Sequence, residues 1–373
     1  MRKLLFVSAF PPSELAAAEK NTKLMLRDLG RDYEVDLVYF KDKDVSEYIP
    51  ELPSIHINKI VHNSMCYRLI NVVLCPFYHP IFTVRYNWIL LKELQKLINK
   101  NKYVAIIFDH SQTLLYARRL CFDGPMILFS HDVEAQRFER KSNKLMSWLC
   151  RKSEKHVLSA QNAYVFTFCQ KDVDLIKNYY NIDAHLCLDY IDNRIIDYTP
   201  INIINRYVLF GNWNRPDNYE GALWLLNGID QYLKSPLQID VIGKGFPKGK
   251  MSNQYKMLKV NVLGFVDNPY QIIAESKALM CPLLSGAGIK VKVIEALASG
   301  TPVLGTEIAF EGFSDKYSKF LIDCKTPKDF ADNLEIINYD INERLAFKKM
   351  FIEDYKTDSI VTWIKKNTEK NKK

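Results

Sequence analysis

The sequence predicts an α/β protein with two domains, each built around a parallel β-sheet. Short runs rich in β-branched and aromatic residues alternate with helical patterns along the chain, which is typical of parallel α/β architecture. The alternation breaks off in a polar, irregular stretch at 189–205 and then begins again. A chain of 373 residues is also too long for one ordinary domain, and it allows two domains that each bury a core.

Two series of strands are expected. The first comprises residues 4–8, 35–40, 104–108, 126–129 and 164–168. The second comprises residues 207–210, 238–242, 260–263, 278–281, 302–305 and 320–322. Helices are expected between them, and one has apolar residues at the spacing of a face that covers a sheet, namely Trp88, Leu91, Leu94 and Ile98. The predicted division is a first domain at 1–198, a second at 199–350, and a segment at 351–373 with a last helix from 355.

Composition excludes several classes of protein. A hydrophobic content of 48% and a charged content of 25% are those of a globular domain, not of a disordered chain or a multispanning membrane protein. The eight cysteines are scattered, without a C-x-x-C pair or a His/Cys cluster at zinc spacing, so we expect a reducing cytoplasm and no metal. The apolar run at 4–7 is too short for a signal peptide.

The net charge of +8 raises the question of an anionic partner. No nucleic-acid motif is present, so an anionic membrane surface is favoured over nucleic acid. Part of the charge lies in a tail with Lys365, Lys366, Lys370, Lys372 and Lys373, which can also be a plain solvated end. The segment 67–91 is rich in aliphatic and aromatic residues but too interrupted to span a bilayer. It is either packed in the core or part of a surface that touches lipid.

A loop and helix at 284–303 predict a phosphate site. Gly286 and Gly288 let a ligand approach the main chain, and Lys290 and Lys292 add positive charge just before and within a helix whose first N–H groups are unpaired. Glu295 follows on the same helix and supplies a hydrogen-bond acceptor beside these donors. A diphosphate together with sugar hydroxyls suggests a nucleotide.

This segment resembles the glycosyltransferases of family 4, which have the GT-B fold. It matches their pattern G-x-G-x-K-x-K-x-x-E-A-x-x-x-G-x-P-V at nine positions, Gly286, Gly288, Lys290, Lys292, Glu295, Ala296, Gly300, Pro302 and Val303. The resemblance implies two Rossmann-like domains whose parallel sheets face a central cleft. It also implies a last helix that returns to the first domain.

The resemblance assigns the nucleotide sugar to the second domain. It implies that Glu295 binds the ribose, while Lys290, Lys292 and the backbone of Gly288 and Ile289 stabilise the diphosphate. Many family members have a second glutamate eight positions before the first, where this chain has Ala287, which leaves the donor sugar open. Three further strand-end segments match family elements that border the nucleotide, and their expected donor-binding residues are Gly211, Arg215, Gly243, Lys244, Phe265 and Val266.

The first domain is expected to bind the acceptor. The loop after its first strand carries Pro12 and Ser13, where family members usually have a Gly-Gly pair; a plain strand-to-helix connector is the alternative. His131 resembles the strand-end histidine that lies near donor sugar and acceptor in many family 4 enzymes, although it can also cap the next helix. His110 ends a similar strand and is a second acceptor-side candidate.

These residues predict a retaining glycosyltransferase (EC 2.4) that moves a sugar from a UDP- or GDP-linked donor to a saccharide or lipid-linked acceptor. His131, Lys292 and Glu295 are the expected catalytic residues. A metal-dependent GT-A enzyme is not favoured, and no cofactor is expected. A bacterial surface polysaccharide or lipid-linked oligosaccharide is the predicted pathway, at the cytoplasmic face of the plasma membrane. A GT-B sugar-nucleotide epimerase and a non-catalytic nucleotide-sugar-binding protein are the alternatives.

Overall fold

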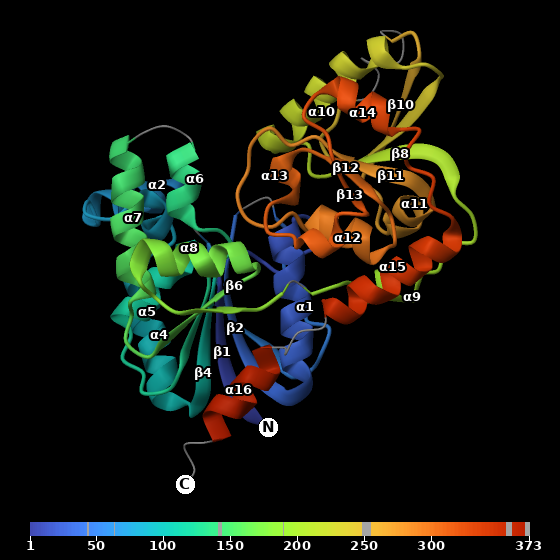
Figure 1. The fold of residues 1–373 in the computed structure, drawn as a ribbon. Coiled ribbons are helices and arrows are strands. Elements are labelled where there is room, and N and C mark those ends of the chain that lie inside the picture. Colours follow the sequence, from blue (N-terminus) through green and yellow to red (C-terminus); the bar gives the residue numbers. More distant parts are fainter. Residues whose placement is uncertain are drawn as a thin grey trace. The chain divides into compact units, whose positions relative to one another are not determined.

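The computed structural model describes residues 1–42, 45–62, 64–140, 144–188, 190–247, 255–355 and 360–369. The chain divides into two compact units (Figure 1). Unit 1 contains residues 1–190 and 357–373, and unit 2 contains residues 191–356. Lys370, Lys372 and Lys373 of the basic tail lie outside the described residues.

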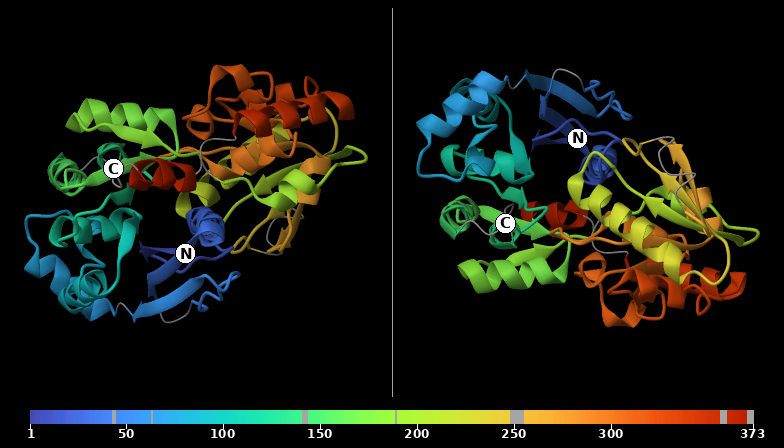
Figure 2. Two further views of the ribbon diagram at one scale, coloured as in Figure 1. Left: turned by 90° about the horizontal axis from the view of Figure 1, so that it is seen from below. Right: turned by 90° about the horizontal axis from the view of Figure 1, so that it is seen from above.

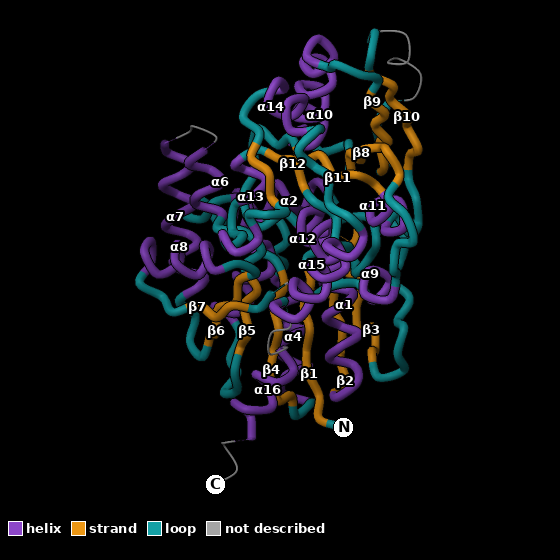
Figure 3. The backbone as a smooth tube through the Cα atoms, turned by 45° about the vertical axis from the view of Figure 1, so that its right-hand side comes forward, coloured by secondary structure: helices purple, strands orange, loops and turns teal. Residues whose placement is uncertain are grey.

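Unit 1 is built on a seven-stranded parallel sheet with the order β3-β2-β1-β4-β5-β6-β7. Its strands lie side by side in Figure 3. They are β1 (Arg2–Ser8), β2 (Tyr33–Lys41), β3 (Ile55–His62), β4 (Tyr103–Asp109), β5 (Met126–Phe129), β6 (Ala163–Thr167) and β7 (Ala184–Leu186). The order reverses between β1 and β4, so the loops after these two strands diverge and leave room for a ligand.

Helices cover this sheet on both faces because successive side chains of a strand point to opposite sides. Leu5 and Val7 of β1 pack in one core cluster with residues of the helices on one face of the sheet, among them Leu90 of α4. On unit 1, Trp363 of α16 packs edge-on against Phe166 of β6, and α16 lies beside α1 in Figure 2. The helices are α1 (Ala17–Asp32), α2 (Met65–Leu74), α3 (Pro80–Thr83), α4 (Trp88–Lys100), α5 (Leu114–Arg119), α6 (Glu134–Arg140), α7 (Lys144–Leu158), α8 (Gln170–Tyr180) and α16 (Ile360–Glu369).

Unit 2 has a six-stranded parallel sheet with the order β10-β9-β8-β11-β12-β13, which reverses between β8 and β11. Its strands are β8 (Ile204–Phe210), β9 (Leu237–Ile242), β10 (Leu258–Gly264), β11 (Ser276–Cys281), β12 (Val303–Gly305) and β13 (Leu321–Asp323). Its helices are α9 (Asn193–Asp197), α10 (Pro216–Ile229), α11 (Tyr270–Glu275), α12 (Val291–Ala298), α13 (Glu307–Phe310), α14 (Pro327–Asn333) and α15 (Ile341–Asp354). In Figure 1, α10 and α14 lie on one face of the sheet and α11, α12 and α15 on the other.

The two predicted sheets are confirmed, and every expected strand is present. β3 and β7 were not predicted, because β3 alternates exposed polar with apolar residues and β7 has only three residues. The division of the chain also differs from 198/199 and 350/351. α9 belongs to unit 2, where the Lys348 ammonium donates to the Ile195 and Tyr198 carbonyls, and the buried Phe351 packs on Tyr317.

The last helix begins at Ile360 and not at 355, since Asp354 ends α15. No helix in the described part of the chain is long and apolar enough to cross a membrane.

Candidate functional site

The candidate nucleotide-binding residues of unit 2 gather at the carboxyl edge of its sheet, where the strand order reverses. The loop after β8 and the loop that joins β11 to α12 both start at this point. Ligands of open parallel sheets bind at such points, because the two neighbouring connections run to opposite faces. The loop that we expect to bind phosphate therefore lies where ligands bind in open parallel sheets.

Glycines let the strand-end loops of unit 2 approach one another closely. Gly243 has a φ of 124°, and a Cβ there would lie 1.8 Å from the Gly211 carbonyl oxygen. A Cβ on Gly211 would in turn lie 3.1 Å from the Lys292 ammonium nitrogen. Gly286 and Gly288 also have positive φ, 151° and 65°. The positive φ of Gly243, Gly286 and Gly288 favours glycine at these three positions, so the backbone lines the floor of the site.

Lys292 points its charge at this floor. Its ammonium donates to Asn218 Oδ1 at 2.8 Å, and the Asn218 amide donates to the Asn212 carbonyl at 2.9 Å. Burial lowers the pKa of Lys292, and the neighbouring Cys281 and Glu295 offset this only in part. An anion bound beside Lys292 would restore the full charge of the ammonium, since an opposite charge favours the ionised form.

Lys290 holds the loop that it ends. Its ammonium is buried, donates to the Gly288 carbonyl at 2.5 Å and lies 3.9 Å from a carboxylate oxygen of Glu311. It also precedes the first turn of α12, as the cap residue. Lys290 therefore keeps the backbone of the loop in a fixed conformation, a role that the sequence alone did not indicate.

Glu295 lies buried in α12 and accepts a hydrogen bond from the Tyr270 hydroxyl at 3.0 Å. The remaining donor-side residues line the same edge with more exposure. Arg215 is exposed at the start of α10, and Lys244 is exposed after β9. Phe265, just beyond β10, leaves 54% of its surface to solvent, whereas Val266 is partly buried. Phe265 thus offers an aromatic face on which a base can stack.

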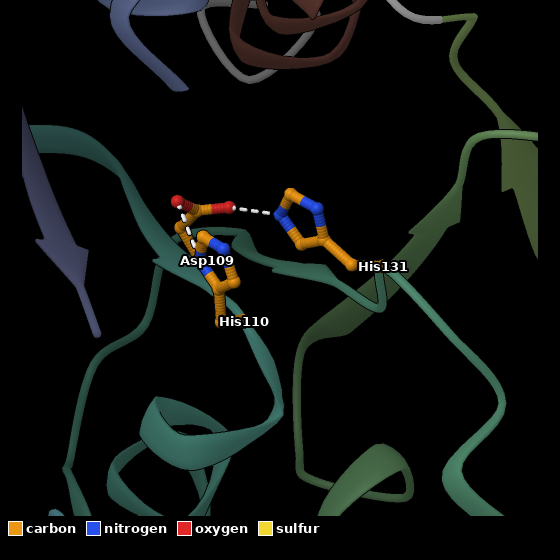
Figure 4. A group of neighbouring side chains, drawn as sticks. All are labelled: Asp109, His110 and His131. Atoms are coloured by element: carbon orange, nitrogen blue, oxygen red, sulfur yellow. Dashed lines mark hydrogen bonds and ion pairs between the residues drawn. The ribbon is translucent and has the colours of Figure 1, made fainter. Parts of the chain in front are cut away.

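Unit 1 brings His110, His131 and Asp109 together at the switch between β1 and β4 (Figure 4). His131 Nε2 lies 2.6 Å from one carboxylate oxygen of Asp109, and His110 Nδ1 lies 2.9 Å from the other. The two imidazole rings stack with centroids 3.9 Å apart. Two candidates that the sequence treated separately therefore share one buried carboxylate.

Asp109 is the centre of this group. It is fully buried and accepts hydrogen bonds from the Thr22 and Ser8 hydroxyls at 2.6 and 3.2 Å. Burial alone would raise the pKa of the Asp109 carboxyl, but the charges and hydrogen bonds of His110 and His131 outweigh it and hold that pKa far below its usual value. Asp109 is thus a fixed negative charge that orients both rings. Their ligand atoms lie within 4.8 Å of one another, so the same three residues can also hold a cation.

His110 has a strained backbone. Its φ of 72° and ψ of 149° lie in a region that only glycine adopts readily, at a cost of about 1–3 kcal/mol. Its Nε2 is buried and has no hydrogen-bond partner among the described residues. Strain and an unpartnered nitrogen in one side chain are typical of a functional residue.

The loop after β1 holds the acceptor-side candidates Pro12 and Ser13. Pro12 is buried, and the Ser13 hydroxyl donates to the Glu19 carboxylate. Phe10 of this loop packs edge-on against the His110 ring, with centroids 5.0 Å apart. Phe10 and not Ser13 therefore links this loop to the histidines.

Sequence reasoning missed three residues of these sites: Asp109, Asn218 and Tyr270. Asp109 ends β4 as its only acidic residue and directly precedes His110, which is a signal that the sequence offered. Asn218 lies in the first turn of α10, and its contact with Lys292 reveals its role. Tyr270 is recognised solely through the fold, because it lies 25 residues from Glu295.

Comparison with known proteins agrees with this geometry. Residues 205–338 match the family model described as glycosyl transferases group 1. The matched residues all lie within unit 2. The match includes the loop at 284–290, α12 and the strand-end glycines of β8 and β9.

One curated relative is 28% identical over 156 residues, an uncharacterised 44.6 kDa protein in the cps region of Klebsiella pneumoniae. The match spans 39% of this chain and 40% of that relative.

Solved structures resemble the chain over nearly its whole length. Sucrose-phosphate synthase from Thermosynechococcus elongatus has a TM-score of 0.71 at 13% identity, covering 95% of this chain and 94% of its own. HepE from Anabaena, solved with UDP-glucose, has a TM-score of 0.66 at 13% identity, covering 100% and 99%. The fold is therefore the GT-B fold of these glycosyltransferases, as the sequence predicted.

Proposed function

We propose that this protein is a glycosyltransferase that moves a sugar from a nucleotide-sugar donor to an acceptor hydroxyl with retention of anomeric configuration. The observation that carries the proposal is the loop at 284–290 with α12, which combines glycines, a buried lysine and a buried glutamate at the switch point of unit 2. The family match at 205–338 supports it, as does the similarity to HepE, which was solved in complex with UDP-glucose.

In this proposal unit 2 binds the donor. Lys292 and the N–H groups at the start of α12 neutralise the diphosphate. They stabilise it further as it leaves the donor sugar with the electron pair of the bond that joined them. Glu295, held by Tyr270, accepts hydrogen bonds from the ribose. Phe265 and Val266 contact the base, and Arg215 and Lys244 add charge at the exposed rim. The reaction needs no cofactor besides the nucleotide sugar.

Unit 1 binds the acceptor. Asp109 fixes His131, whose ring donates a hydrogen bond to a hydroxyl of the donor sugar or of the acceptor. His110 shares this carboxylate and packs on Phe10. The pathway that we propose is a bacterial surface polysaccharide or lipid-linked oligosaccharide, and the relative in a cps region supports it.

We also infer that unit 1 touches a membrane at the cytoplasmic leaflet. α2 exposes a group of large apolar side chains, and Phe77, three residues beyond the helix, is exposed as well. We name this group the α2 patch: Met65, Leu69, Ile70, Val73, Leu74 and Phe77. Exposed apolar groups of this size mark interaction sites. The second half of the segment 67–91 packs in the core through Phe82, Tyr86 and Leu90, so each of the two interpretations of this segment describes one half of it.

A donor screen tests the proposed function. Calorimetry with UDP, GDP, CMP and dTDP, followed by their sugars, identifies the nucleotide. Incubation of the preferred sugar nucleotide with membrane and polysaccharide extracts should then release the free diphosphate only when an acceptor is present. Conversion of the donor without acceptor would indicate an epimerase. Binding without turnover on every extract would indicate a non-catalytic protein.

A further inference from the structure

A buried arginine of unit 1 lies outside the machinery described above. Arg85 occupies the connection between α3 and α4 and exposes 6% of its surface. The Tyr116 hydroxyl donates to the Arg85 carbonyl at 2.8 Å and fixes the backbone there. The positive charge of Arg85 needs a partner group that compensates it, because a buried charge is costly unless it is paired.

The compensation inside the chain is incomplete. The nearest carboxylate, Asp42, lies 3.9 Å from one terminal nitrogen of Arg85, and the other terminal nitrogen has no hydrogen-bond partner among the described residues. Asp42 is shared with Arg68 of α2, whose Nε also lacks a hydrogen-bond partner within the described ranges. Among the described residues, Glu19 is the other acidic group that acts on Arg85, and it accepts a hydrogen bond from the Ser13 hydroxyl.

The guanidinium groups of Arg85 and Arg68 thus share the carboxylate of Asp42. Burial raises the pKa of Glu19, and burial lowers the pKa of Arg85 to about 10, so Arg85 still carries its charge at neutral pH. The local balance is positive. The Arg85 guanidinium carbon lies 4.6 Å from the centroid of the Phe10 ring, a distance at which the ring attracts the cation.

Phe10 connects this cation to the histidines. The centroid of the same ring lies 5.0 Å from that of the His110 ring, so Arg85 and His110 both contact one aromatic side chain. Both side chains carry a buried, unpartnered donor or acceptor at the carboxyl edge of the same sheet. A ligand that reaches His110 can therefore place a neighbouring anionic group against Arg85.

We propose that Arg85 and Arg68 form an anion subsite that binds a phosphate ester of the acceptor. Two guanidiniums from different elements suit a phosphate, whose oxygens accept hydrogen bonds from several directions. Because Arg68 belongs to α2 and Arg85 packs on Phe10, the subsite extends from the helix of the α2 patch to the ring that contacts His110. The acceptor class is a phosphorylated saccharide or a lipid-linked one. The identification of the ligand as an acceptor rests on the proposed function, whereas the anion site itself does not.

The test measures phosphate binding apart from catalysis. In a Lys292→Ala background, which removes the lysine charge at the unit 2 loop, calorimetry with sn-glycerol 3-phosphate should show saturable binding. Arg85→Gln should weaken that binding at least tenfold, and Arg68→Gln, at a half-exposed position, should weaken it severalfold with no change in melting temperature. Arg31→Gln is the matched control, because Arg31 is exposed at the end of α1, which connects to the amino end of β2.

The outcomes separate the anion site from the enzyme. Phosphate binding that depends on Arg85 and Arg68 supports the subsite even if no nucleotide binds and the proposed function fails. Absent binding, or equal binding by the folded Arg68→Gln variant and the Arg31→Gln control, overturns it. A phospholipid head group is the other source of phosphate. Loss of co-sedimentation with phosphatidylglycerol vesicles in Arg85→Gln, with unchanged glycerol phosphate binding, would overturn the assignment to an acceptor.

Discussion

The two candidate sites treat charge in opposite ways. In unit 2 the Lys292 ammonium donates to the neutral side chain of Asn218, so a negative ligand would complete the arrangement. In unit 1 the central charge is the buried carboxylate of Asp109, and it is already satisfied by two histidines and two hydroxyls. The first arrangement is suited to binding an anion, whereas the second is suited to holding imidazole rings in place.

The largest expected effect separates positioning from binding. His131→Ala should lower turnover by about 10²–10⁴-fold, the range for loss of a positioned acid, base or donor, while the affinity for the nucleotide stays unchanged. Asp109→Asn should produce a smaller fall in turnover and change its pH dependence, because the rings lose the charge that orients them. Steady-state kinetics and calorimetry on the same variants measure both quantities. An equal loss of turnover and nucleotide affinity would remove the distinction between the sites.

A buried pair of carboxylates behind His131 should make the stability of unit 1 depend on pH. Glu154 accepts hydrogen bonds from the first N–H groups of α6, those of Glu134 and Ala135, and from the Tyr180 hydroxyl. Burial, reinforced by nearby acids, raises the pKa of Glu134 to about 8, and burial raises the pKa of Glu154 to about 7. The folded state therefore binds protons that the unfolded state has released above about pH 4.5.

The sign follows from these shifts. The stabilisation is complete below about pH 4.5 and is lost as the pH rises toward 8, so this pair should lower the free energy of unfolding by a few kcal/mol across that interval. Urea titrations at several pH values measure the slope. Glu134→Gln should flatten it, because a neutral amide of the same size replaces the titrating group. A free energy of unfolding that rises over this pH range in the wild type, and is unaffected by the variant, would contradict the assignment.

The third prediction concerns the anion-binding arrangement of unit 2. Lys292→Ala should weaken binding of the preferred nucleoside diphosphate by about 10- to 100-fold, since a charge-assisted hydrogen bond is worth roughly 1.5–3 kcal/mol. Lys234→Ala is the matched control, because Lys234 is a well-exposed lysine of the same unit that forms an ion pair with Glu335 at 3.7 Å. Unchanged affinity in Lys292→Ala would exclude the loop at 284–290 as the diphosphate site.

The same contrast explains how much was predictable. The site of unit 2 lies largely within one contiguous segment, from Gly286 to Glu295, so spacing alone predicts its members. The site of unit 1 is assembled from strand ends far apart in the sequence, and Asp109 joins His131 across 22 residues. Sheet order decides that contact, and no local pattern encodes sheet order. The strands were predictable because buried parallel strands are nearly continuous apolar runs, whereas the half-exposed β3 lacks that signal.

The smallest expected effect tests whether unit 1 also has a binding surface outside its charged site. Val73 and Phe77 of the α2 patch leave 75% and 81% of their surfaces exposed, and each should contribute about 1 kcal/mol on entering the lipid interface. The double substitution Val73→Ser/Phe77→Ser should therefore weaken co-sedimentation with phosphatidylglycerol vesicles roughly tenfold, while the melting temperature stays unchanged, because neither side chain is buried. Ile201→Ser is the control, as Ile201 is an equally exposed aliphatic residue of unit 2.

Raising the salt concentration should weaken binding further, because salt screens the attraction between the lipid and Arg68 and other basic residues near it. If the wild-type protein stays in the supernatant at low salt, the α2 patch does not bind lipid, and a soluble acceptor becomes the better proposal.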